Sequence, residues 1–138
     1  MSNLHFFYGT MAASKSTKLI TDRYNFEQKG TSVFVIKPKI DRTNEPKIVS
    51  RIGLECPANI MEQIRVEYIT EQLYDVYMID EVQFFTTEDI DNLVKLADIY
   101  KKLVFCFGLL TDVNEELFPA SKHLIEVGAK LHNQNYII

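Results

Sequence analysis

Residues 4–17 read LHFFYGTMAASKST, an apolar run that gives way at Gly9 to a loop of small residues ending in Lys15 and Ser16. The spacing matches the phosphate-binding pattern of a glycine, four residues and then Gly-Lys-Ser/Thr, except that Ser14 stands at the second glycine. A buried strand before the loop and a helix after it would complete the context that the pattern requires. Taken alone, the match is as typical of an ordinary loop before an amphipathic helix as of a phosphate site.

The residue types in this loop suit an anionic ligand. Backbone N–H groups and the positive end of a following helix attract phosphates. Lys15 is expected to reach the β- and γ-phosphates of a nucleoside triphosphate, and Ser16 to ligate Mg²⁺. Ser14 adds a Cβ, which either weakens phosphate binding or is offset by a hydrogen bond from its hydroxyl. The predicted phosphate-binding residues are Gly9, Thr10, Met11, Ala12, Ala13, Ser14, Lys15, Ser16 and Thr17.

Apolar runs and helical patterns alternate along the rest of the chain. Buried strands are predicted over residues 4–8, 32–37, 75–79 and 103–107, short edge strands over 47–50 and 53–56, and a last strand over 135–138. Helices are predicted over residues 15–29, 87–101 and 120–132, and within 59–73. The pattern predicts an α/β fold, a P-loop NTPase-like parallel sheet with helices on both faces, as a single domain over residues 1–138. Ligands of such sheets bind at the carboxyl ends of the strands.

A second motif follows the strand predicted over residues 75–79. Asp80 is expected at the end of a strand neighbouring the phosphate-loop strand, where an aspartate can hold Mg²⁺. Glu81 would then be placed to act as a general base on a hydroxyl nucleophile. Of the two aromatic residues that follow, Phe84 and Phe85, one is expected to anchor the next helix and the other to stack on a nucleobase. The order of the two motifs favours a nucleoside triphosphate site over a chance pair of carboxylates.

Composition narrows the partners and the compartment. The 138 residues carry a net charge of −4 without a basic cluster, which disfavours nucleic acid as a partner. No apolar run reaches the length of a membrane span, and the amino terminus lacks the features of a signal peptide. Cys56 and Cys106 lie far apart and outside any metal-binding spacing, so they are predicted to be small buried residues in a reducing cytoplasm.

Four segments together resemble class II thymidine kinases, in the order that this family has. They are residues 8–17, the KPKID of residues 37–41 followed by VSRIG at 49–53, the IDEVQFF of residues 79–85, and FGL at 107–109 with the TD of residues 111–112. The resemblance implies transfer of the ATP γ-phosphate to the 5′-hydroxyl of thymidine, with ATP and Mg²⁺. It also implies nucleotide and nucleoside small molecules as partners and a homo-oligomer, a dimer or tetramer.

The resemblance also assigns roles to single residues. It places Asp80 in the metal shell with Ser16, supported by Asp41, and makes Glu81 the catalytic base. The nucleoside-binding positions are Gln83, Phe84, Gly108, Leu109 and Val113, with Phe84 as the stacking ring.

Departures from the family pattern count against full catalytic activity. Ser14 replaces a glycine, Thr43 replaces an arginine that the adjacent Arg42 could substitute, and Val113 replaces a phenylalanine of the base pocket. The chain is expected to stop before the family's zinc-ligand cysteines, so zinc and the lasso that covers thymidine are expected to be absent.

Three hypotheses follow. The presence of Lys15, Ser16, Asp80 and Glu81 favours a thymidine kinase, weak or impaired. The departures favour a catalytically inactive module that binds nucleotide or protein. The third hypothesis is a structural protein that keeps the fold alone and would expose apolar surface unless a partner covers it.

Overall fold

The computed structural model describes residues 3–10, 15–40 and 45–134. Within these ranges, six strands form one sheet in the order β5-β2-β6-β7-β1-β8, and every neighbouring pair is parallel. The strands are β1 (Leu4–Gly9), β2 (Val33–Pro38), β5 (Asn59–Met61), β6 (Val76–Ile79), β7 (Leu103–Leu109) and β8 (Lys130–Asn133). The parallel sheet predicted from the apolar runs is thus confirmed.

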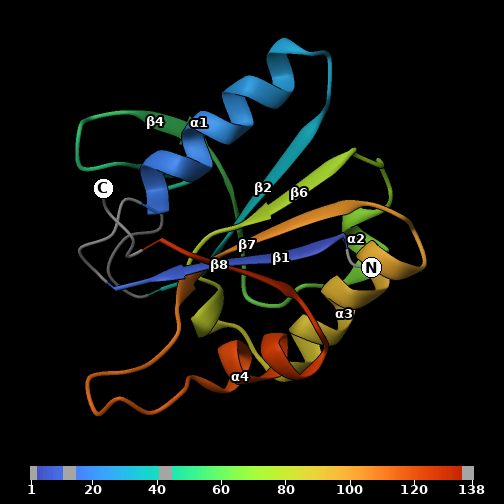
Figure 1. The fold of residues 1–138 in the computed structure, drawn as a ribbon. Helices are drawn as coiled ribbons and strands as arrows, with labels where there is room; N and C mark the ends of the chain where they lie inside the picture. Colours follow the sequence, from blue (N-terminus) through green and yellow to red (C-terminus); the bar gives the residue numbers. More distant parts are fainter. Residues whose placement is uncertain (1–2, 11–14, 41–44, 135–138) are drawn as a thin grey trace.

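Layers cover both faces of this sheet (Figure 1). On one face lie helix α1 (Lys15–Gln28) and the antiparallel pair of β3 (Lys47–Val49) with β4 (Glu55–Pro57). On the other face lie α2 (Val66–Ile69), α3 (Thr87–Asp98) and α4 (Pro119–Glu126). The short 3-10 helix η1 (Val82–Phe84) joins the end of β6 to α3. Helices on both faces were predicted, and the structure confirms them.

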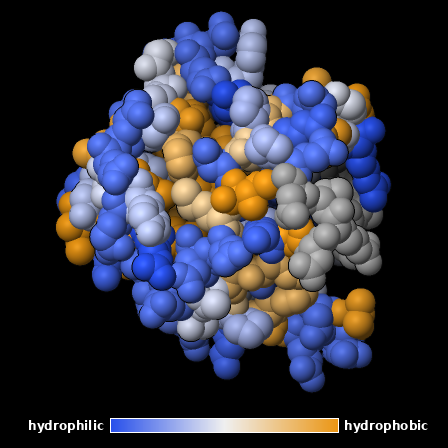
Figure 2. All heavy atoms as spheres, turned by 180° about the vertical axis from the view of Figure 1, so that it is seen from behind, coloured by the Kyte–Doolittle hydropathy of each residue, from blue (hydrophilic) through white to orange (hydrophobic). Residues whose placement is uncertain are grey.

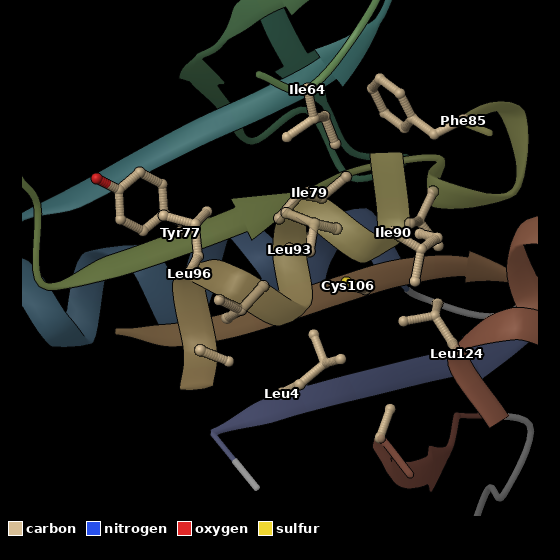
Figure 3. Packing of buried hydrophobic residues seen from close by; sticks show 14 of the residues in the cluster. Leu4, Ile64, Tyr77, Ile79, Phe85, Ile90, Leu93, Leu96, Cys106 and Leu124 are labelled. Carbon is tan, nitrogen blue, oxygen red and sulfur yellow. The ribbon is translucent and has the colours of Figure 1, made fainter. Parts of the chain in front are cut away.

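Each strand divides its side chains between the two faces. In β1, Phe6 packs into the core under α3 and α4, whereas Phe7 packs into the core under α1. Figure 3 shows the first of these cores, where Ile90 and Leu93 of α3 point toward the sheet. Both faces are apolar, so the strands read as continuous apolar runs rather than alternating ones.

The start of α3 is fixed by a capping box. The Thr86 side chain accepts a hydrogen bond from the Asp89 backbone, and the Asp89 side chain accepts one from the Thr86 backbone. The other Asp89 oxygen accepts from the Ile64 backbone N–H at 2.9 Å, which explains how a buried carboxylate is satisfied. Thr86 is therefore the N-cap of α3, directly before the first residue of the helix.

The order of the strands corrects one expectation. β6, which Asp80 follows, is not next to β1, because β7 pairs with both and lies between them. The sequence indicates which segments are strands but not which of them are neighbours. The carboxyl ends of β1, β7 and β6 nevertheless remain at one edge of the sheet.

The last predicted helix is wrong at its end. α4 stops at Glu126, and the chain turns at Gly128, which has a φ of 83°, a value that favours glycine. The residues after this turn form β8, which pairs with β1. The strand predicted over residues 135–138 lies outside the described residues.

Two shorter predictions also need correction. The segments predicted as edge strands are strands, but β3 and β4 pair with each other instead of extending the large sheet. The segment over residues 59–73 contains the predicted helix as the short α2, and it also supplies β5, an edge strand of the large sheet.

Hydrophilic residues dominate the surface seen from behind, and apolar residues gather in the middle of that face (Figure 2). Among the described residues, no helix has the length and apolar character that crossing a bilayer requires.

Candidate active site

A cavity of about 790 Å³ lies where β1, β6 and β7 end. Its size falls within the range of roughly 300–1,000 Å³ usual for small-molecule sites. In the β1–β7 ladder, Gly9 lies opposite Leu109, so the beginning of the predicted phosphate loop and one wall of the cavity are neighbours. The lining residues are Tyr8, Gly9, Thr10, Lys15, Ser16, Thr17, Val49, Arg51, Ile52, Glu81, Gln83, Phe84, Leu109, Leu110, Thr111, Asp112, Val113 and Phe118.

Lys15, the first residue of α1, is held at the polar end of this cavity. Its side chain is buried, and its Nζ donates to the Thr10 backbone carbonyl at 2.6 Å. Burial lowers the pKa of Lys15, and the carboxylates of Glu81 and Asp80 oppose that shift. Ser16 and Thr17 line the same end, beside the positive end of α1. Met11, Ala12, Ala13 and Ser14 lie outside the described residues, so their predicted contacts with phosphate stay predictions.

Asp80 follows β6 as a buried carboxylate. Its backbone N–H donates to the Ile36 carbonyl at 2.8 Å, which fixes the chain at the end of the sheet. Burial raises the pKa of Asp80 to about 7, the Glu81 charge adds to the rise, and Lys37 and Lys15 oppose it. A carboxylate that is costly to ionise in this way fits a site for a divalent cation, whose charge would stabilise the ionised form. Asp41, the other acidic residue predicted near the metal, lies outside the described residues.

Glu81 lines the cavity and has a left-handed backbone conformation, with a φ of 50°. This conformation is unusual for a residue other than glycine and is a form of local strain often found at functional sites. The Glu81 Oε2 accepts a hydrogen bond of 2.9 Å from the side-chain amide of Gln83.

Four of the five predicted nucleoside-binding residues, Gln83, Phe84, Leu109 and Val113, line the cavity, whereas Gly108 is not among its lining residues. Phe84 is half exposed and meets Phe118 edge to face, with 6.2 Å between the ring centroids. Phe85 instead packs into the core beside α3, which confirms the predicted anchor, and stacking of Phe84 on a nucleobase stays a prediction. Leu109 lines the wall, and Val113 lies at the rim with 94% of its surface exposed.

Gly108 lies within β7 and tightly against η1. A Cβ at this position would come within 2.3 Å of the Gln83 Oε1 and within 3.1 Å of the Val82 backbone nitrogen. The glycine therefore serves close packing between β7 and η1.

The hairpin of β3 and β4 adds residues whose roles were not predicted. Arg51 and Ile52, in its turn, line the cavity, and the charge of Arg51 contributes to lowering the pKa of Lys15. Ser50 shapes the turn by accepting a hydrogen bond from the Leu54 backbone. The motif VSRIG contained this signal, but only the pairing of β3 with β4 shows that its arginine faces the cavity.

Lys15 and Glu81 thus line one cavity, and Asp80 is buried close enough to act electrostatically on Lys15. The roles predicted for these three residues stay predictions. Away from this cavity, Cys56 and Cys106 are buried free thiols, and burial raises the pKa of both. Across residues 3–10, 15–40 and 45–134, no group of three or more His, Cys, Asp or Glu residues has a metal-holding arrangement.

Comparisons with known proteins identify relatives of the whole chain. A family model described as thymidine kinase matches residues 2–137. The thymidine kinase of enterobacteria phage T4 is 37% identical over 138 residues, which cover 95% of this chain and 72% of the phage protein. The thymidine kinases of Salmonella choleraesuis strain SC-B67 and Escherichia coli strain K12 are each 36% identical over 139 residues, covering 95% of this chain and 67% of those proteins.

Proposed function

The chain belongs to the thymidine kinase family, and from this premise we propose that it transfers the γ-phosphate of ATP to the 5′-hydroxyl of thymidine. The observation that carries the proposal is that a buried lysine at the start of α1 lines one cavity with Glu81 and interacts electrostatically with the adjacent buried carboxylate of Asp80. The proposed nucleotide-binding domain extends over residues 1–138.

The polar end of the cavity is proposed to bind the triphosphate. The Lys15 ammonium exchanges the Thr10 carbonyl for phosphate oxygens, and the amino-terminal end of α1 adds its partial positive charge. Residues 9–17 are the proposed phosphate-binding segment, of which Gly9, Thr10, Lys15, Ser16 and Thr17 line the cavity. Arg51, in the turn of the β3–β4 hairpin, lines the same cavity and supplies a second cation.

The Ser16 hydroxyl and the Asp80 carboxylate are the proposed Mg²⁺ ligands, with Asp41 in support. Mg²⁺ supplies charge neutralisation across the β- and γ-phosphates when bound. Asp80 is buried, so little water can compete with the cation for its carboxylate.

Glu81 is the proposed general base. As the 5′-oxygen of thymidine forms its bond to the γ-phosphorus, Glu81 takes the hydroxyl proton, and the bond to the bridging oxygen of ADP breaks. Phe84 is proposed to stack on the thymine ring, with Leu109 and Val113 beside the nucleoside. Gln83 lines the same cavity, and Gly108 packs behind the Gln83 side chain.

The test is transfer from radiolabelled ATP to thymidine by the purified chain with Mg²⁺. Glu81→Gln, which keeps the shape and removes the base, should lower kcat by about 100-fold or more. If the unmodified chain shows no more turnover than Glu81→Gln while calorimetry still detects ATP binding, the proposal fails and a nucleotide-binding module without catalysis takes its place.

The surroundings of the enzyme belong to the same proposal. We propose a homo-oligomer, a dimer or tetramer, on the resemblance alone, and light scattering would decide the mass. A cytoplasmic location is supported by the two free buried cysteines, which suit a reducing compartment.

A further inference from the structure

We propose that Gln83 is a positioning residue, whose carboxamide holds the Glu81 carboxylate at the cavity and ties it to the end of β7. The inference rests on the proposed function, because it assumes that Glu81 acts as the base. It assigns Gln83 a task different from direct contact with the nucleoside.

Two hydrogen bonds fix the orientation of the Gln83 side chain. The Leu109 backbone N–H donates to Oε1 at 3.0 Å, and Nε2 donates to Glu81 Oε2 at 2.9 Å. A backbone N–H can only donate, so it selects the carboxamide oxygen, and the NH₂ group must then face Glu81. The orientation needed to hold a carboxylate is therefore set by the end of β7.

The surroundings leave the carboxamide little freedom. Gln83 is only 3% exposed, although it touches the cavity. Its Oε1 occupies the space that a Cβ on residue 108 would need, so the side chain packs directly against the backbone of Gly108. A nucleoside could accept from the amide proton that faces Glu81 only by displacing the Glu81 carboxylate.

Glu81 needs such support because little else on its own element restrains its side chain. It precedes η1 in a left-handed conformation and has no side-chain cap bond there. A long carboxylate side chain loses rotamer freedom when it is ordered, and a fixed partner offsets part of that cost. The bond from Gln83 uses Oε2, so we assign Oε1 of Glu81 to the substrate hydroxyl.

The support continues beyond β7. The Leu109 carbonyl accepts a 2.6 Å hydrogen bond from the hydroxyl of Ser121, which is fully buried in α4. The chain of contacts from Glu81 through Gln83 and Leu109 to Ser121 joins η1, β7 and α4. Through these contacts the position of Glu81 is held by β7 and α4, and catalysis requires a reacting group to be held in a fixed geometry.

The kinetic test compares Gln83→Leu, which removes both hydrogen bonds, with Gln83→Glu, which keeps an acceptor for Leu109 but repels Glu81. Both should lower kcat about 10- to 100-fold and change KM for thymidine less than about threefold. The matched controls are Asn92→Leu and Asn92→Asp, because Asn92 donates a comparable 2.7 Å bond to the Ile64 carbonyl away from the cavity. These controls should keep kcat within about twofold of the unmodified chain.

A kcat that stays within twofold while KM for thymidine rises tenfold would overturn the inference, because it would mean contact with the nucleoside. If Gln83→Leu does not fold, the isosteric Gln83→Glu decides alone. An unmodified chain without turnover refutes the proposed function instead, and the following measurement then judges the inference.

This second measurement needs no turnover. In ¹⁵N-labelled protein, the side-chain amide signals of Gln83 should shift on Glu81→Ala, while the Leu109 amide stays protected from hydrogen exchange. In Gln83→Leu, the Leu109 amide should exchange faster. Gln83 signals that are unchanged by Glu81→Ala would refute the positioning contact.

Discussion

Gly108→Ala should slow the reaction without touching a substrate. The added Cβ would lie 2.3 Å from Gln83 Oε1, whereas ordinary contact begins at 3.4 Å, so the carboxamide must move by about 1.1 Å. Val82 also crowds the added Cβ, with a side-chain carbon at 3.0 Å and its backbone nitrogen at 3.1 Å. A misplacement of this size near a catalytic group can cost about 100-fold, so we expect kcat to fall by about 10- to 100-fold. Overpacking should also cost about 1–3 kcal/mol of the free energy of unfolding.

Steady-state transfer from ATP to thymidine measures the first effect, and urea unfolding measures the second. The double variant Gly108→Ala with Gln83→Ala is the control, because shortening Gln83 removes the closest clash. In that background Gly108→Ala should destabilise the fold less, while kcat stays low because the support of Glu81 is lost. A Gly108→Ala protein with unchanged kcat and unchanged stability would refute this account of the contact between β7 and η1.

Three further outcomes follow from the charged groups. Lys15→Met should lower kcat/KM for ATP by about 100-fold or more in the transfer assay while the protein stays folded by circular dichroism, and retained activity would remove the lysine from the mechanism. Folding raises the pKa of Asp80 from 3.8 to about 7, so ionised Asp80 destabilises the ligand-free fold most above pH 7 and not at all well below 3.8. Asp80→Asn should therefore raise the melting temperature more at pH 8 than at pH 4.5, and it should abolish turnover. An equal rise in melting temperature at the two pH values would contradict the raised pKa of Asp80. A hydrogen bond to Asp91 raises the pKa of His123 above 6.5, so the stability that it contributes is present below pH 6.5 and is lost as pH rises through the folded pKa. His123→Gln should lower the melting temperature at pH 6 more than at pH 9, with Asp91→Asn as the matched variant, and a larger loss at pH 9 would refute the pairing.

Much of the site was predictable because its chemistry is local in the sequence. The strand before Gly9, the start of α1 at Lys15 and the acidic end of β6 are each encoded by a few adjacent residues. Phe84, the last residue of η1, is exposed, and Phe85, which follows it, is buried, so adjacent positions give the two rings opposite surroundings. Parallel strands bring their carboxyl ends to one edge of a sheet, so the ends of β1 and β6 and the start of α1 are expected at the same edge.

The rest depended on contacts between distant segments. The place of β7 between β1 and β6 is a choice of pairing that apolar runs do not encode. The helix predicted over residues 120–132 extends into β8 because the helical pattern of the sequence continues past the turn at Gly128. These residues form a strand because they pair with the edge of β1, a contact between distant segments. The bond between Gln83 and Leu109 joins residues 26 positions apart, and no local pattern indicates it.

The left-handed backbone at Glu81 has a consequence for how this chain can change. A non-glycine residue in that conformation costs about 1–2 kcal/mol, and a glycine there would be better tolerated. A laboratory selection for thermal stability alone should therefore replace glutamate at this position and yield a more stable protein without catalytic activity. Retention of Glu81 through such a selection would show that something other than activity keeps it in place.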